Sequence, residues 1–224
     1  MRARTAVTTA ALAATAALVL TACGGGGGSG DSDKIASSPT ATTPSAAPTT
    51  AATPTGGAPL RIDPSLALPA DLKVSFDFPA PADRTESVAL SASANFMQSM
   101  MFAVVKQNAS TSGLHTYGSG KAYTYAQQYV QNHIAAKKSL TGTDLFYRPV
   151  VKLQSNKSVA EVTFCENQSH LYSKEIRTGK VHTTAPSDED YTSYDIVLTK
   201  APTQAEWWQA QSVDYKERAL ECKQ

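Results

Sequence analysis

The sequence contains few cysteines and no excess of charge of either sign. Its 224 residues include 3 cysteines, 20 lysines and arginines, and 19 aspartates and glutamates, which gives a formal net charge of +1. A balance this close to zero excludes the strongly basic field that non-specific binding to nucleic acid requires. Neither Cys165 nor Cys222 belongs to a C-x-x-C arrangement, so the cysteines predict no zinc site.

Residues for other metals and for acyl transfer are missing as well. The four histidines have no partner at ligand spacing: His115, His133, His170 and His182. The run Asp188-Glu189-Asp190 lacks the alternating ligands and the glycine of a calcium loop, and we interpret it as a solvated acidic turn. The chain has no G-x-S-x-G motif. We therefore expect no metal and no cofactor.

Long apolar runs are also lacking. The alanine-rich stretch from Ala6 to Leu20 is too short for a transmembrane helix, which needs about 20 strongly apolar residues, so membrane spanning is the lesser alternative. Arg2 and Arg4 precede it, and small residues follow it. A positive start, a short apolar stretch and a small-residue border are typical of a secretory signal peptide, here residues 1–22.

The border itself, Leu20-Thr21-Ala22-Cys23, resembles the lipobox of bacterial lipoproteins. The resemblance implies cleavage before Cys23 and a diacylglycerol, with palmitate, on its sulfur. Two or three acyl chains hold a protein firmly at a bilayer, whereas one chain binds only marginally. We expect a chain anchored through Cys23 to the outer face of the cytoplasmic membrane. The alternative is an ordinary secreted protein with a free thiol at residue 23.

Two cysteines remain for the folded part. Removing Arg2 and Arg4 with the leader changes the formal charge from +1 to −1. Outside the cell, Cys165 and Cys222 allow one intramolecular disulfide, which would tie the C-terminal end to a strand. A bridge over such a loop stabilises a domain by about 4 kcal/mol. Two buried free thiols are the alternative.

Residues 23–60 have the composition of a tether. From Gly24 to Pro59 the chain is almost entirely Gly, Ser, Thr, Ala and Pro, with little apolar surface to bury. Such a segment cannot offset its ordering entropy, so we expect disorder, extended locally by the prolines. Its function is to hold the folded part clear of the membrane, or to act as a spacer without a length requirement.

Residues 70–224 are expected to form one domain that begins with helices. Asp83-Arg84-Thr85-Glu86 has capping-box spacing, and apolar residues follow at helical intervals, which predicts a helix over 84–107. Polar, Gly-rich residues 108–120 predict a loop with one helical turn. Helical periodicity returns over 121–137 and predicts a second long helix.

The remaining periodicity is that of strands. Alternation and turn residues predict strands at the following ranges: 72–78, 146–153, 159–165, 171–182, 191–200 and 206–215. The turn Arg177-Thr178-Gly179-Lys180 predicts a hairpin within 171–182. Helices followed by antiparallel strands indicate an α+β domain, with two long N-terminal helices packed on a curved antiparallel sheet.

The pattern is similar to that of actinobacterial lipoproteins with a nuclear transport factor 2-like cone. The resemblance rests on the helix order, on Val162–Ser169, Thr178-Gly179-Lys180 and Tyr194–Leu198, and on Trp208, Ala219 and Cys222. It implies a cone-shaped α+β fold, one that ketosteroid isomerase and polyketide cyclases share. This fold hosts unrelated activities, so the resemblance implies no function by itself.

Enzymes of the cone fold place Asp, His or Tyr in the cavity to move protons, so such residues are the candidates here. They are Asp195, Tyr117, Tyr125, Tyr129 and His133. Tyr125 and Tyr129 at helical spacing indicate core packing with hydroxyls at the rim, and His133 indicates a structural role. Asp195 alternates with Tyr194 and is expected to be exposed. No acid and base stand at the spacing of a catalytic dyad, so no catalytic residue is predicted.

Two functions follow. The first is a non-catalytic binding module at the cell envelope, whose partner is a small apolar ligand, a wall component or another envelope protein. Met97, Met100 and Met101 suit an irregular apolar cavity, with plain core packing as the alternative. The second is a proton-transfer enzyme of the isomerase or cyclase kind that uses Asp195 or a cavity tyrosine.

Overall fold

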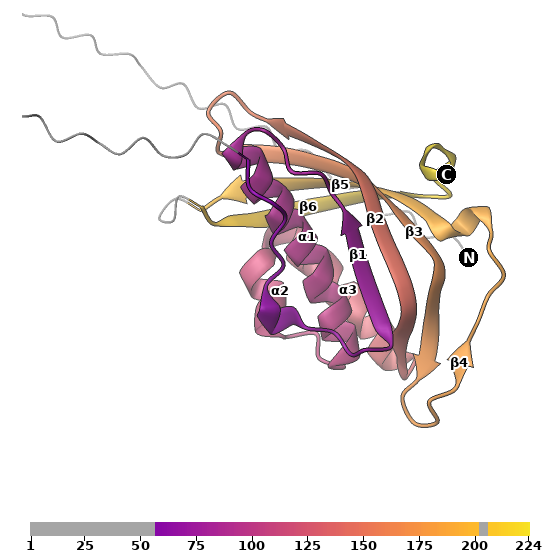
Figure 1. The fold of residues 1–224 in the computed structure, drawn as a ribbon. Helices are drawn as coiled ribbons and strands as arrows, with labels where there is room; N and C mark the ends of the chain where they lie inside the picture. Colours follow the sequence, from indigo (N-terminus) through magenta and orange to yellow (C-terminus); the bar gives the residue numbers. More distant parts are fainter. Residues whose placement is uncertain (1–56, 202–205) are drawn as a thin grey trace, which may run out of the picture. The chain divides into compact units, whose positions relative to one another are not determined.

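The computed structural model describes residues 57–201 and 206–224. The expected signal peptide, Cys23 and nearly all of the expected linker lie outside the described residues. The elements, drawn in Figure 1, are η1 (Pro64–Leu66), β1 (Leu72–Asp77), α1 (Arg84–Val105), α2 (Ser112–Tyr117), α3 (Gly120–Ala135), β2 (Lys138–Leu153), β3 (Val159–Glu175), β4 (Val181–His182), η2 (Asp188–Asp190), β5 (Tyr191–Lys200), β6 (Trp208–Glu217) and η3 (Leu220–Cys222).

Helix α1 is the centre of the core. The Asp83 carboxylate accepts hydrogen bonds from the backbone N–H groups of Thr85 (2.6 Å) and Glu86 (3.1 Å), which begins the helix. Its long apolar side chains are buried: Leu90, Phe96, Met97, Met100, Met101 and Val104. The methionines therefore pack in the core and do not line a cavity. α1 is long and apolar enough to cross a membrane, but most of it is buried inside this domain.

The chain before β1 packs against α1. The backbone N–H of Asp63 donates to Oδ1 of Asn95 at 2.7 Å, and the Asn95 amide donates back to the carbonyl of Arg61 at 2.8 Å. Gln98 donates to the carbonyl of Leu66 at 3.1 Å, and the Leu66 side chain is buried. Residues before 70, where the domain was expected to begin, are thus held by buried polar side chains of α1.

The sheet has the order β1-β2-β3-β5-β6, with β4 paired to β3. All pairs are antiparallel except β1–β2, which is parallel, so the expectation of a purely antiparallel sheet was wrong at this edge. The sheet curves around α1 and α3 (Figure 1). The protein is therefore a mixed α+β domain in which helices cover one face of a six-stranded sheet.

Helices α1 and α3 occupy most of the ranges where helical periodicity was found, and α2 is the expected single turn. They are not the first elements, because η1 and β1 precede them. β2 begins at Lys138, earlier than the expected residue 146, and its pairing with β3 contains a bulge between Thr143 and Leu145.

The turn expected at Asn167-Gln168-Ser169 is absent, because these residues continue β3 through pairing with β2. Long-range pairing here overrides the turn propensity of the three polar residues. The hairpin at residues 177–180 is present and joins β3 to β4.

Cys165 of β3 and Cys222 of η3 form a disulfide, with 5.4 Å between their Cα atoms. The expected link between the C-terminal end and a strand is confirmed. The Tyr147 hydroxyl donates to the carbonyl of Cys222, and the Ala219 N–H donates to the carbonyl of Tyr191 at 2.9 Å. These contacts hold the chain after β6 against the sheet.

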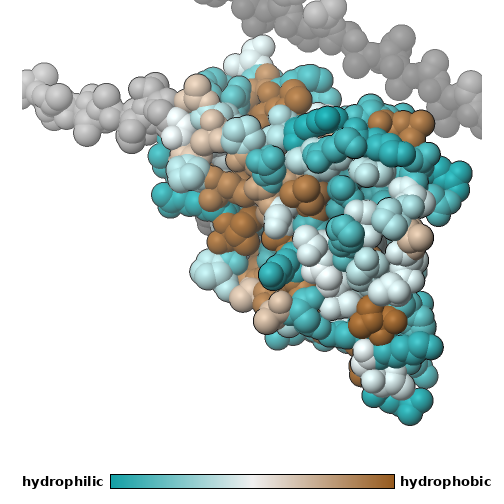
Figure 2. All heavy atoms as spheres, turned by 45° about the vertical axis from the view of Figure 1, so that its right-hand side comes forward, coloured by the Kyte–Doolittle hydropathy of each residue, from teal (hydrophilic) through white to brown (hydrophobic). Residues whose placement is uncertain are grey.

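The described surface carries no large apolar patch on the face shown in Figure 2, where hydrophobic residues form small groups separated by hydrophilic and neutral ones. The large apolar side chains that are most exposed come from different elements and loops: Val150, Ile176, Val181, Tyr215 and Leu220. Single exposed apolar residues are normal on a folded domain, so the hollows of the fold are the better candidates for a functional site.

Candidate ligand-binding site

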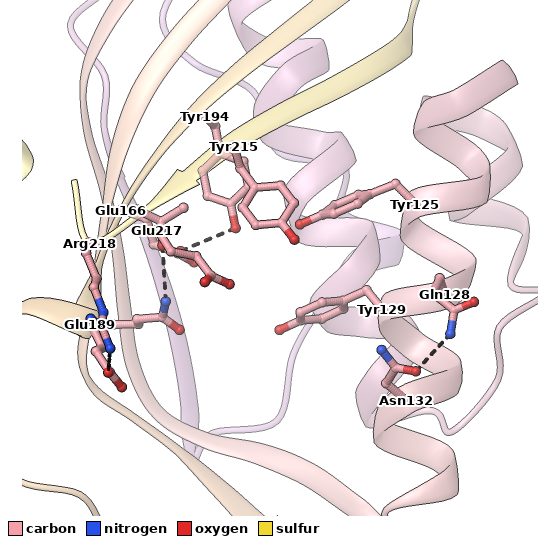
Figure 3. Close-up of a pocket in the computed structure, with 12 residues that line it drawn as sticks. Tyr125, Gln128, Tyr129, Asn132, Glu166, Glu189, Tyr194, Tyr215, Glu217 and Arg218 are labelled. Carbon is pink, nitrogen blue, oxygen red and sulfur yellow. Dashed lines mark hydrogen bonds and ion pairs between the residues drawn. The ribbon is translucent and has the colours of Figure 1, made fainter.

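A hollow of about 510 Å³ lies between α3 and the strands β3, β5 and β6 (Figure 3). Its volume is within the usual range of pockets for small molecules. The lining is mostly polar and consists of Tyr125, Gln128, Tyr129, Asn132, Glu166, Gln168, Glu189, Thr192, Tyr194, Tyr215, Glu217 and Arg218. The expectation of an apolar ligand therefore does not match this lining.

Strand alternation aims the acidic residue Glu166 at this hollow. In β3 the buried side chains of Val162 and Phe164 lie on the face covered by helices, and Glu166 continues that series. Thr192 of β5 lies directly opposite Glu166, and Tyr194 lies opposite Phe164. The strand face that forms the apolar core thus also forms the polar end of the hollow, further along the same strands.

Glu166 is paired with a second carboxyl, that of Asp144 on β2. Asp144 is fully buried and Glu166 is 2% exposed. Neither side-chain oxygen of Asp144 has a hydrogen-bond partner among the described residues, and the Glu166 carboxyl is close enough to raise the pKa of Asp144. Two buried carboxyls so close together cannot both be ionised without a large electrostatic cost, so at least one of them keeps its proton.

Burial sets the proton affinity of this pair. It raises the pKa of Asp144 well above its usual range, and the nearby Glu166 charge adds to that effect. Burial also raises the pKa of Glu166, to about 7, while hydrogen bonds from Asp144, Tyr194 and Thr192 oppose the rise. Asp144 is therefore protonated at neutral pH, and Glu166 titrates near neutrality.

Asp144 lies on β2 opposite a bulge whose extra residue is on β3, and it shares the buried face of Phe146 two residues further on. The pair Thr143–His170 is followed by Leu145–Asn167, so Asp144 has no direct partner on β3. Gly142, just before it, has φ +100°, and a Cβ there would lie 2.1 Å from the His170 carbonyl oxygen. Glycine is required at this position because β3 approaches the backbone of β2 so closely.

Tyrosines surround the acid pair. In Figure 3 the hydroxyls of Tyr125, Tyr129, Tyr194 and Tyr215 point into the same space from α3, β5 and β6. The Tyr194 hydroxyl donates to Oε2 of Glu166 over a long 3.4 Å. Burial raises the pKa of Tyr125 to about 12 and raises the pKa values of Tyr129 and Tyr194 well above their usual range. These hydroxyls are therefore neutral and both donate and accept hydrogen bonds.

At the rim, Arg218 forms an ion pair with Glu189. Glu217 also lines the hollow and has no ion-pair partner among residues 57–201 and 206–224. With the Glu189–Arg218 pair neutral, the lining carries the negative charge of Glu217 and that of Glu166 when ionised.

The structure brings two of the sequence candidates to this hollow, Tyr125 and Tyr129, and both are half-buried. Asp195 lies on the opposite face of β5 and lines a separate hollow with Arg148 and Lys216. It is only partly exposed, and burial and then the Glu161 charge raise its pKa. It is not in a position to act on a ligand beside Glu166.

The other two candidates have structural contacts. His133 lies one turn beyond Tyr129 on α3, where its Nδ1 is 3.0 Å from the Tyr129 carbonyl oxygen, and it does not line the hollow. The Tyr117 hydroxyl donates to Oδ2 of Asp63 at 2.8 Å, and its ring stacks on Trp207. Tyr117 therefore helps to hold the segment before β1.

Sequence reasoning missed Asp144 and Glu166. The alternation Val162, Phe164, Glu166 is a usable signal, because it places a carboxyl on a core face. The expected end of this strand at residue 165 hid that signal, since β3 continues to Glu175. Asp144 offered a similar signal, because it lies two residues before Phe146 on the same face of β2, but the expected start of this strand at residue 146 left it out.

Comparisons with known proteins assign no family. No family model matches the chain, and no curated protein matches it. Among solved structures, the chain is similar to the intermembrane space region of the chloroplast protein ARC6, with 7% identity and a TM-score of 0.39 over 59% of this chain and 96% of that one. It is also similar to a nuclear transport factor 2-like superfamily protein from Salmonella enterica serovar Typhimurium, with 11% identity and a TM-score of 0.39 over 59% of this chain and 92% of that one. Likenesses this distant carry no functional information.

Proposed function

We propose that this protein is a lipid-anchored, extracytoplasmic binding module without catalytic activity, whose nuclear transport factor 2-like domain takes up a small polar molecule. The lipobox-like border at Cys23 supports the anchor. The observation that carries the binding function is the hollow of about 510 Å³ lined by Tyr125, Tyr129, Tyr194 and Glu166.

The buried carboxyls at the hollow argue for a ligand, because their burial lowers the stability of the folded state. Burying two carboxyls without a cationic partner lowers the stability of the folded state, and apolar residues of similar volume would stabilise this part of the core. A protein that keeps such a pair beside a hollow gains from it in function and not in stability. A bound molecule with hydrogen-bond donors would satisfy both the carboxyls and the tyrosine hydroxyls.

Native mass spectrometry of the protein purified from its own membranes tests the binding function. We expect a co-purifying small molecule that is lost from a Tyr129→Leu variant, which removes the hydroxyl and the aromatic ring from the hollow and leaves a smaller apolar side chain. A Tyr172→Leu variant is the matched control, because Tyr172 on β3 is not among the lining residues. Protein that is free of ligand in the wild type would contradict the proposal.

One observation favours a second candidate function, a proton-transfer enzyme. Glu166 lines the hollow with its pKa raised by burial to about 7, and such a carboxyl can both take and return a proton at neutral pH. The two functions differ in the fate of the ligand. A proton-transfer enzyme in deuterated water would exchange a C–H of the bound molecule for deuterium, and a Glu166→Gln variant would not. A binding module would return the molecule unlabelled in both proteins.

A further inference from the structure

We propose that the hollow binds a small organic cation, a protonated or quaternary amine, with its charge beside Glu166 and Glu217 and its hydrocarbon part against the tyrosine rings. This inference rests on the proposed binding function and specifies its ligand class. It is carried by the charges of the lining, by the tyrosine arrangement and by the missing counter-charge of the buried carboxyl pair.

The counter-charge is missing on every side of the pair. The groups of the described chain that face Glu166 are Asp144 from β2, Thr192 and Tyr194 from β5, and Tyr125 and Tyr129 from α3. None of these is a cation. The nearest arginine of the lining, Arg218, is engaged by Glu189 at the rim. A carboxyl pair that is buried without a cation is stabilised in its ionised form by a ligand that supplies one.

Glu217 at the rim of the hollow also favours a cationic ligand. Glu217 follows Tyr215 by two residues on β6, and both line the hollow together with the buried acid. An ammonium group between Glu166 and Glu217 would meet a carboxylate on each side. An anionic ligand would meet two like charges in a partly desolvated space, which is unfavourable.

The tyrosines suit an amine with methyl or methylene groups. The rings of Tyr125 and Tyr215 have centroids 5.6 Å apart, and those of Tyr194 and Tyr215 are 6.2 Å apart, so three rings form one wall. Aromatic faces attract alkylammonium groups through the ring quadrupole, and tyrosine hydroxyls accept hydrogen bonds from N–H donors. Figure 3 shows this wall facing Tyr129 and Glu166.

A metal ion fits this donor set less well than an organic cation. The three glutamates of the lining, Glu166, Glu189 and Glu217, do not converge, and within the described ranges no three His, Cys, Asp or Glu side chains come together to hold a metal. Calcium takes six to eight oxygen ligands, and aromatic rings supply none. The volume of about 510 Å³ also far exceeds what an ion requires.

The test uses three probes of nearly equal shape and different charge. Choline is the cation, 3,3-dimethylbutan-1-ol is its neutral carbon isostere, and 3,3-dimethylbutanoate is the anion. Each is titrated by isothermal calorimetry into the full-length lipidated protein in maltoside micelles. At about pH 8 we expect choline to bind at least about tenfold more tightly than the alcohol, and the carboxylate not to bind.

The affinity for choline should also depend on pH. Glu166 attracts the cation only when its carboxyl is ionised, and its pKa is about 7. The fraction of protein with ionised Glu166 therefore falls about thirtyfold between about pH 8 and pH 5.5. We expect the choline affinity to fall by about the same factor and the affinity of the alcohol to stay constant. Binding of choline near pH 7 should release a proton, which titrations in buffers of different ionisation enthalpy detect.

Matched variants locate the effect. Glu166→Gln should remove the pH dependence and most of the preference for choline over the alcohol, and Glu217→Gln should weaken choline binding but keep the pH dependence. Glu161→Gln is the control, since Glu161 lies on the same strand but on the opposite face and pairs with Lys152. Circular dichroism shows whether each variant is folded, and Glu166→Gln removes a destabilising charge, so it is expected to fold.

The outcomes separate the inference from the proposed function. Equal binding of choline and the alcohol, or a pH dependence that survives in Glu166→Gln, would overturn the cation inference and leave a binding module. Preferential binding of the carboxylate would overturn it in the same way. Failure of all three probes to bind at millimolar concentration would overturn the inference, and the co-purification experiment then decides the binding function separately.

Discussion

At the scale of single residues, the unusual feature is a pair of carboxyls placed where the core would otherwise be apolar. Glu166 continues the buried face of β3, and Asp144 lies on the buried face of β2, two residues before Phe146. Both have raised pKa values because burial disfavours their charged forms. The pair therefore makes the stability of the domain depend on pH.

The sign of this dependence follows from linkage. The pKa of Glu166 rises on folding from its usual 4.5 to about 7, so between these values the folded state holds a proton that the unfolded state has lost. The free energy of unfolding should fall by about 3 kcal/mol as pH rises through this range. Urea unfolding of wild type and Glu166→Gln between about pH 5 and pH 8 checks this prediction.

Asp144, whose pKa is also raised on folding, adds its own fall in both proteins, so we expect Glu166→Gln to lose the part of the slope that Glu166 contributes and to exceed the wild type in stability at about pH 8. Glu161→Gln, on the exposed face of β3, should follow the wild-type curve. A Glu166→Gln protein with an unchanged pH slope would show that the pair does not titrate in this range.

At the scale of elements, α1 depends on its first turn. The Asp83 carboxylate caps two backbone N–H groups and forms an ion pair with Lys157 at 2.7 Å. Its pKa is lowered to about 2, first by the hydrogen bond from Lys157 and then by the backbone N–H of Glu86. The stabilisation from this carboxylate is therefore present above its ordinary pKa of 3.8 and is lost as pH falls toward 2.

Asp83→Ala should lower the free energy of unfolding by about 1 kcal/mol at neutral pH, because it removes the cap. Asp83→Asn keeps a capping oxygen and loses only an exposed ion pair, so it should cost less than about half of that. Equal losses in the two variants, measured by thermal or urea unfolding, would show that the ion pair and not the cap matters.

The disulfide is the second stabilising contact between structural elements. Cys165 and Cys222 are separated by 57 residues, and closing a loop of this length stabilises the folded state by about 4 kcal/mol in the chain-entropy model. The double variant Cys165→Ser/Cys222→Ser should be less stable than wild type by about this amount in urea. Wild type with a reducing agent should match the double variant, and a loss below about 1 kcal/mol would contradict the prediction.

At the scale of the whole molecule, the anchor and the folded domain make separate predictions. Cys23 lies outside the described residues, so its modification remains a prediction from the border Leu20-Thr21-Ala22-Cys23. Cells that express the wild type should incorporate labelled palmitate and hold the protein in the membrane fraction. Cys23→Ser should abolish the label, and Cys165→Ser/Cys222→Ser should keep it. Label that persists in Cys23→Ser would place the lipid elsewhere.

Much of the local structure could be predicted from short-range patterns. The period of 3.6 over α1 and α3, the alternation in β5 and the hairpin turn at Thr178-Gly179-Lys180 are all properties of neighbouring residues. The pairing of Cys165 with Cys222 followed from a count, because Cys23 is expected to carry lipid and no other cysteine remains.

The site could not be predicted in the same way. Tyr125 and Tyr129 were identified from helical spacing, but their partners Glu166 and Asp144 come from strands whose limits depend on long-range pairing. The bulge at Asp144 and the continuation of β3 through Asn167-Gln168-Ser169 both go against local propensity.

The sequence by itself thus determined the order of helices and strands, the available disulfide and the approximate balance of charge, because each depends on neighbouring residues or on composition. Tertiary structure alone decided that two carboxyls are buried together near four tyrosines, and that Asp195 faces away from them. Burial and strand register determine those properties, and both arise only when residues distant in the chain pack together.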